Sequence, residues 1–114
     1  MDLFAQSITT LEKSLDLRMQ SQRLVAANLA NIDTPGYTAQ KLDFDASMER
    51  ALQGAENPAV VTLSTEPGRS LDGNNVNLEG ELGMLGENKM MYSVTAQILA
   101  AKFRQISSIV DQLQ

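Results

Sequence analysis

The stretch ANLANIDTPGY, residues 27–37, marks the point where a long apolar-periodic segment from the N-terminus ends. Pro35 disfavours the α conformation at Thr34, so a helix arriving here should end at or before that residue. Pro35 and Gly36 then suit the two central positions of a type II turn, because proline fixes a negative φ and glycine accepts a positive φ. The stretch therefore predicts a helix end followed by a defined change of chain direction.

Two asparagines precede this turn. Asn28 and Asn31 lie three residues apart, so their amides should share one face of the last helical turn, beside Tyr37. The stretch holds no nucleophile, base or metal-ligand cluster, which favours directed packing over chemistry. The predicted packing motif consists of Asn28, Asn31, Pro35, Gly36 and Tyr37.

Upstream of the turn, apolar residues alternate at spacings of three and four, as in a coiled-coil seam that includes Ile8, Leu11 and Leu15. A helix over residues 2–32 would be about 45 Å long at ~1.5 Å per residue. A compact domain of this size has a radius of gyration of only ~13 Å. We therefore predict an elongated molecule.

Leu17 and Leu24 fall nearly opposite Leu15 on a helical wheel, where a helix buried on one face should be polar. Two interpretations remain open. The leucines are scattered exposed residues, which are common on protein surfaces, or the helix packs against its own chain on one side and against another subunit on the other.

The middle of the chain predicts little regular structure. Residues 38–53 are typical of an extended exit followed by a short helix from Asp45, with an acidic group that we interpret as a solvated face. The segment lacks the glycine-containing loop of a calcium site. Residues 59–63 have strand character, and we predict that they pair with Val76 and Leu78 as a small hairpin around Asp72-Gly73.

The C-terminal segment predicts a second long helix. Asn77 is a suitable N-cap, although glycines at positions 80, 83 and 86 weaken the first turns. Its apolar residues cover about half of the helix circumference, more than one core needs, and they include the predicted seam residues Ile98, Ile106 and Ile109. Two seam-bearing helices can bury only one seam between them, so apolar surface should remain for a partner.

The predicted fold class is therefore mainly α. Residues 1–34 and 77–114 should form a coiled-coil-like pair of long helices, and residues 35–76 between them in sequence should form an irregular or β-hairpin middle region. We expect this acidic middle region to project from one end of the helix pair.

Composition excludes several classes of function. The 114 residues suit one domain and contain no Cys and no His, which excludes thiol, imidazole and most zinc chemistry, so we expect no cofactor and no enzyme. A net charge of −5 argues against nucleic-acid binding. No apolar run is long enough to span a membrane, and we expect no cleavable signal peptide and no small-molecule substrate.

The quoted stretch, together with TAQKLDFDASMERAL after it and DGNNVNLEGELGMLGENKMMYSVTAQILAAKF near the C-terminus, resembles the flagellar rod and hook axial proteins. The resemblance covers roughly residues 8–53 and 70–110 and is narrowest to the short proximal rod members. It implies a non-enzymatic structural subunit of the basal-body rod, exported by the flagellar type III apparatus, which assembles into a hollow helical drive shaft that serves motility and crosses the periplasm.

The same resemblance implies partners and a candidate export signal. The partners would be further copies of the chain, the rod proteins FliE, FlgC and those of the FlgF/FlgG class, the export gate FliP/FliR and the MS-ring base. Phe44 and Met48 match the pattern of a phenylalanine followed four residues later by a hydrophobic residue. Two alternatives remain: another rod protein such as FlgC, or a soluble helical adaptor or export chaperone that binds a partner helix.

Overall fold

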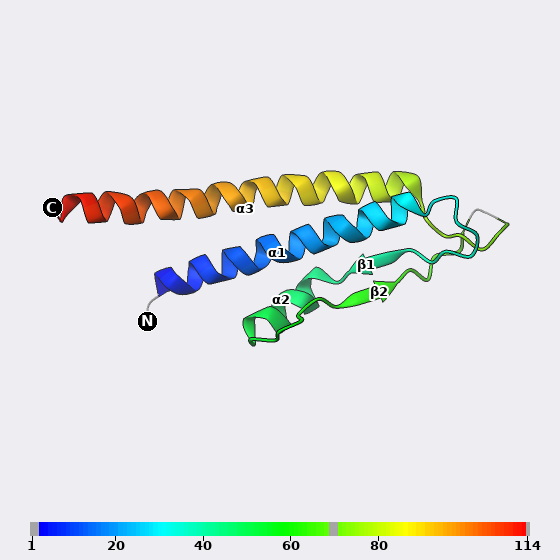
Figure 1. Ribbon diagram of the computed structural model, residues 1–114, viewed down its shortest axis with the longest axis horizontal. Helices are drawn as coiled ribbons and strands as arrows, with labels where there is room; N and C mark the ends of the chain where they lie inside the picture. Colours follow the sequence, from blue (N-terminus) through cyan, green and yellow to red (C-terminus); the bar gives the residue numbers. More distant parts are fainter. Residues whose placement is uncertain (1–2, 69–70, 114) are drawn as a thin grey trace.

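The computed structural model describes residues 3–68 and 71–113, and in them five elements form an elongated molecule (Figure 1). Its principal extents are 68 × 25 × 15 Å and its radius of gyration is 18.2 Å, against ~13 Å for a compact domain of about this size. The predicted mainly α, elongated architecture is confirmed. In chain order the elements are α1 (Leu3–Ala30), β1 (Gln40–Leu42), α2 (Phe44–Leu52), β2 (Val61–Leu63) and α3 (Leu78–Gln112).

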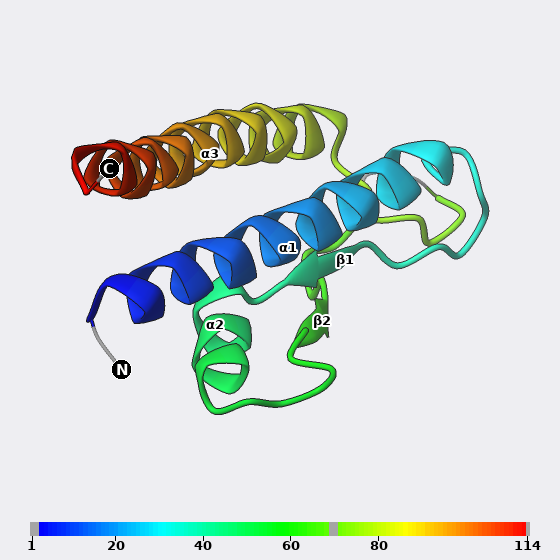
Figure 2. The same cartoon turned by 60° about the vertical axis from the view of Figure 1, so that its left-hand side comes forward.

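Helix α1 is the central element and contacts α3, α2 and β1. Helix α3 runs antiparallel to α1 on one side, and α2 with the two strands lies on the other side (Figures 1 and 2). The expectation that the middle region projects from one end is wrong. The chain reverses after α1 and the middle region folds back along this helix, because its apolar side chains bury themselves there.

The most buried apolar cluster lies between α1 and the middle region. Leu17 is 1% exposed and packs with Leu42 of β1 and Ala51 of α2, while Leu24 and Phe44 add partly buried contacts. Neither interpretation of Leu17 and Leu24 was correct, since they are not scattered exposed residues and their cover comes from the same chain. The two-sided packing of α1 that the pattern indicated is present within one molecule.

The two strands pair antiparallel, with Lys41 opposite Thr62 at the centre of the register. The predicted hairpin partner of β2 was therefore wrong: β2 pairs with the chain that leaves the turn, and not with residues 76–78. The physical reason is that α3 already begins at Leu78, while the Asn75 side chain accepts a hydrogen bond from the backbone N–H of Ala39 at 2.7 Å.

Both later helices begin at side-chain caps. Asp43 Oδ1 accepts the backbone N–H of Ala46 at 3.1 Å, so α2 begins one residue before the predicted position. Asn77 Oδ1 accepts the N–H of Gly80 at 3.2 Å, which confirms the predicted N-cap of α3. The helix continues without interruption through all three glycines near its start.

Apolar side chains remain exposed along α3. We define the α3 stripe as the residues at 36 to 57% exposure that lie within 60° of Met91 on the helical wheel, namely Met91, Val94, Ile98, Ile106 and Ile109. The C-terminal part of α3 also runs past the start of α1 (Figure 1), and residues 103–113 are exposed throughout. The fold therefore leaves apolar helix surface without cover.

Replacing the most buried leucine should test where the core lies. We expect Leu17→Ala to lower the free energy of unfolding by about 2–4 kcal/mol, because it removes buried methyl groups and leaves a cavity. Met19→Ala on the same helix, where the side chain is 41% exposed, should change it by less than about 0.5 kcal/mol. Denaturant unfolding measures both, and equal losses would contradict this location of the core.

Candidate functional site

The turn after α1 has the predicted geometry. Gly36 has a φ of +73°, and the Thr34 carbonyl accepts the backbone N–H of Tyr37 at 3.3 Å across the turn. Gly36 also donates its own N–H to the Asp72 carbonyl at 2.8 Å, which attaches the loop before α3 to the turn. Pro35-Gly36 thus occupies the two central positions of a type II turn, as predicted.

The Asn28 side chain is fully buried at the end of α1 and joins four elements of the fold. Its Nδ2 donates to the Gln40 carbonyl at 2.7 Å and to Glu81 Oε2 at 3.0 Å. Its Oδ1 accepts from the Tyr37 hydroxyl and from the Gln40 N–H, both at 3.0 Å. An amide has two N–H donors and two lone pairs, so its hydrogen-bonding capacity is filled. One side chain thus ties α1 to the turn, to β1 and to α3.

Asn31 is half-buried and acts more locally than Asn28. Its Nδ2 donates to the Ala27 carbonyl at 2.8 Å, and its Oδ1 accepts from the Thr34 hydroxyl at 3.0 Å. Its backbone carbonyl accepts from Asn74 Nδ2 at 2.8 Å. The two predicted asparagines therefore have different roles: Asn28 joins the elements, and Asn31 stabilises the end of the helix.

Two asparagines that the sequence analysis missed complete this junction. Asn74 is 3% exposed, and its Nδ2 also donates to the Thr34 carbonyl at 2.8 Å. Asn75 donates from Nδ2 to the Ser64 carbonyl at 3.2 Å, besides accepting from Ala39. The run DGNNVN before α3 was the available signal, because asparagine and aspartate side chains often bond neighbouring backbone.

Glu81 is a carboxylate buried at 4% exposure in the first turns of α3. Burial raises its pKa above the ordinary value of 4.5, while the hydrogen bond from Asn28 and the charge of Lys41 act in the opposite direction. The sequence analysis did not select this residue.

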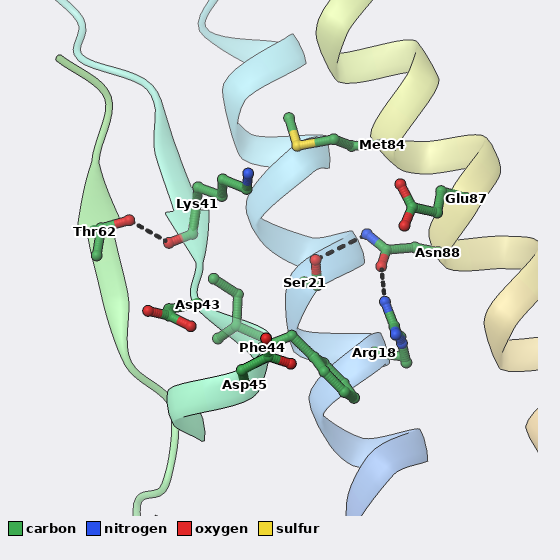
Figure 3. A pocket seen from close by; sticks show the side chains of 11 residues that line it. Arg18, Ser21, Lys41, Asp43, Phe44, Asp45, Thr62, Met84, Glu87 and Asn88 are labelled. Atoms are coloured by element: carbon green, nitrogen blue, oxygen red, sulfur yellow. Dashed lines mark hydrogen bonds between the residues drawn. The ribbon is translucent and has the colours of Figure 1, made fainter. Parts of the chain in front are cut away.

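A row of polar residues at heptad spacing on α3 faces α1. Its members are Glu81, Asn88, Thr95 and Lys102, of which the first three are buried. Asn88 Nδ2 donates to Ser21 Oγ at 2.8 Å, and its Oδ1 accepts from Arg18 Nη1 at 3.2 Å (Figure 3). The ammonium of Lys102 lies 5.3 Å from the ring centroid of Phe4. The two long helices are therefore held in register by polar and cation–π contacts.

The predicted seam residues lie partly in and partly outside this interface. The three on α1 are half-buried: Ile8, Leu11 and Leu15. The three on α3 are exposed at 45%, 37% and 57% respectively: Ile98, Ile106 and Ile109. Leu11 and Ile98 line the same open groove between α1 and α3.

The candidate export-signal residues are folded into the molecule. Phe44 and Met48 are half-buried beside the core cluster. The Arg18 guanidinium lies 3.8 Å from the centroid of the Phe44 ring, a close cation–π contact between α1 and α2 (Figure 3). Nearby, Asp43 and Asp45 line a cleft of about 390 Å³ between β1, α1 and α3.

Truncating the joining asparagine should destabilise the whole fold. We expect Asn28→Ala to lower the free energy of unfolding by about 3 kcal/mol or more, because it leaves buried partners, one of them charged, without hydrogen bonds. Asn31→Ala, which removes only local bonds, should cost about 1 kcal/mol. Thermal and denaturant unfolding measure both, and a loss at Asn28 no greater than at Asn31 would contradict the joining role.

The buried carboxyl should leave a signature in the pH dependence of stability. Because the folded state raises the pKa of Glu81, it binds this proton more tightly than the unfolded chain does, so the Glu81 contribution to stability falls as the pH rises above 4.5. Glu81→Gln keeps an oxygen acceptor for Asn28 and removes the titration. Its stability relative to the wild type should therefore improve between pH 4.5 and pH 7. A pH-independent difference in unfolding free energy would show that Glu81 does not titrate abnormally.

No helix within the described ranges has both the length and the apolar character that crossing a membrane requires.

Comparisons with known proteins find relatives of the sequence that forms this junction. The family model described as flagella basal body rod protein matches residues 15–38, which cover the second half of α1 and the turn. The flagellar basal body rod protein FlgB of Borrelia hermsii is 29% identical over 134 aligned positions, which include 96% of this chain and 99% of the relative. FlgB of Salmonella typhimurium and FlgB of Escherichia coli are each 28% identical over 88% of this chain and 89% of the relative. The segment that ends α1 and turns at Pro35-Gly36 lies in the region that the family model matches, and the similarity to FlgB runs along nearly the whole chain, so the protein is similar to the flagellar basal body rod proteins over its length.

Proposed function

We propose that the chain is a structural, non-enzymatic subunit of the proximal part of the flagellar rod. After type III export it assembles with its neighbours into a hollow helical drive shaft that crosses the periplasm and serves motility. The match of residues 15–38 to the rod family model and the similarity to FlgB over nearly the whole chain support this function. They favour it over the soluble adaptor or export chaperone, and the absence of Cys and His fits a protein without catalytic chemistry.

The observation that carries this proposal is the uncovered α3 stripe. Its members are at least 36% exposed, although they are large apolar side chains on one stable helix. At ~25 cal/mol per Å², covering several hundred Å² of apolar surface contributes several kcal/mol. Contiguous apolar surface of this kind marks a protein interaction site. The subunit therefore gains its missing stability from neighbours.

The partners follow from this role. The exposed helix faces would be covered by further copies of the chain and by the rod proteins FliE, FlgC and those of the FlgF/FlgG class. The export gate FliP/FliR and the MS-ring base would be the partners at the base of the rod. Within each subunit the packing motif sets the angle between α1 and the middle region, and therefore the orientation of the surfaces that neighbours contact. This motif consists of Asn28, Asn31, Pro35, Gly36 and Tyr37.

The candidate export signal fits the same scheme. Phe44 lies beneath Arg18 in the folded subunit, so the export apparatus would read Phe44 and Met48 only in the unfolded chain. The same two side chains then become part of the core when the exported chain folds.

A charge placed in the α3 stripe should block assembly without unfolding the subunit. Val94 is 44% exposed, so Val94→Glu should leave the helical circular dichroism spectrum and unfolding midpoint nearly unchanged. In a flagellated strain that depends on this gene, it should abolish swarming. Ser93→Glu, at an exposed residue on the side of α3 away from the centre of the stripe, should remain motile. A motile Val94→Glu strain would count against the proposed use of the stripe.

A further inference from the structure

The two-stranded sheet has one covered edge and one open edge. Asn28 bonds to the backbone of Gln40 on the outer edge of β1, and β1 lies between α1 and β2 (Figures 1 and 2). Among the elements of the described residues, β1 is the main contact of β2. The far edge of β2 therefore faces solvent.

The hydrogen bonds of the sheet fix which backbone groups of β2 point toward β1. Ser64 donates its N–H to the Ala39 carbonyl and Asp43 donates its N–H to the Val60 carbonyl, both at 2.8 Å. Hydrogen-bonded pairs alternate with other pairs along an antiparallel ladder. The central residue of β2, Thr62, therefore also directs its N–H and carbonyl toward β1.

Val61 and Leu63 lie between these positions, so their N–H and carbonyl groups are directed away from β1. Their side chains share one face of the strand and are 47% and 62% exposed. Open sheet edges are commonly protected by lysine or proline, and neither residue stands at these two positions. An extended segment placed along this edge would bond to both residues and cover both side chains.

The chain around this edge is acidic. Residues 54–68 contain the exposed carboxylates of Glu56 and Glu66 and no lysine or arginine. In the wider middle region, residues 35–76, the acidic residues outnumber the basic ones: Asp43, Asp45, Glu49, Glu56, Glu66 and Asp72 stand against Lys41, Arg50 and Arg69. A second copy of β2 would bring like charges to this edge, while a basic segment would be attracted to it.

We propose that the outer edge of β2 binds an extended basic segment of a different protein, which adds to the sheet as a third strand. Apolar residues at alternate positions of that segment would cover Val61 and Leu63, and lysine or arginine near its ends would pair with Glu56 and Glu66. The proposal goes beyond the rod function, because this surface lies on the opposite side of α1 from α3 (Figure 1) and recognises backbone as well as side chains.

Hydrogen exchange measured by NMR tests the proposal at the edge itself. In the purified, dilute chain the amides of Val61 and Leu63 should exchange quickly, and that of Thr62 more slowly, since of the three only Thr62 bonds to β1. The probe is a short capped peptide in which valine and threonine alternate, with lysine at both ends. At saturation it should slow exchange at Val61 and Leu63 by about tenfold or more. The same peptide with glutamate at both ends should have little effect.

Two matched variants separate the edge from general attraction to an acidic surface. Leu63→Lys places a charge on the edge and should weaken binding of the lysine peptide by about tenfold or more. Leu52→Lys changes the net charge equally at a side chain that is 56% exposed on α2, and it should weaken binding by less than about threefold. Circular dichroism should show that both variants keep the fold.

Four outcomes would overturn the proposal. They are slow exchange at Val61 and Leu63 in the dilute chain without peptide, no added protection by the lysine peptide, and equal weakening in the two variants. The fourth is protection of Val61 and Leu63 that rises with protein concentration alone, which would show that a second copy covers the edge. None of these bears on the rod function, since that function is tested independently by swarming at Val94.

Discussion

The buried amide of Asn28 is the interaction on which the arrangement of the other elements depends. A two-stranded sheet has little stability of its own in water. Here a side chain covers the outer edge of β1. Asn28 accepts a hydrogen bond from the N–H of Gln40 and donates one to its carbonyl, as a neighbouring strand would. The remaining donor and acceptor reach Glu81 and Tyr37. The middle region, the turn and the start of α3 therefore share one fixed point on α1.

Polar contacts within the molecule explain why apolar surface is left outside it. The face of α3 toward α1 uses Glu81, Asn88 and Thr95, while Val94 and Ile98 of the α3 stripe lie in solvent. Hydrogen-bonded polar pairs add modest net stability, but they disfavour a slipped register, because a slip would leave further buried groups without partners. The subunit thus fixes its own shape with polar bonds and keeps apolar area for its neighbours. This division suits a part whose final stability is reached in an assembly.

Local chemistry was enough to predict some of these features from the sequence. The end of α1, the type II turn and the Asn77 cap follow from residues that act on their own backbone, and the structure has all three. The pairing of β2 does not, because residues 40–42 were expected only to leave the turn in an extended conformation, with no sign that they form its partner strand. The choice is made by Asn75, which bonds to Ala39 and Ser64 across long sequence separations. No periodicity in the sequence reports such a contact.

The helix seam shows the same limit in a different form. An apolar heptad through Ile8 and Leu15 predicted the contact face of α1. Two of the hydrogen bonds to α3 come instead from Ser21 and Asn28, which lie one position before residues 22 and 29, where that heptad continues. Ser21 meets Asn88 and Asn28 meets Glu81, so the position numbers in each pair have the same sum, as antiparallel helices require. Hydrophobic periodicity identifies the most apolar face of a helix, but it does not distinguish a face that the same chain covers from a face that a neighbouring molecule covers. In a subunit built to assemble, the most apolar face of a helix is the one that its own fold has least reason to bury.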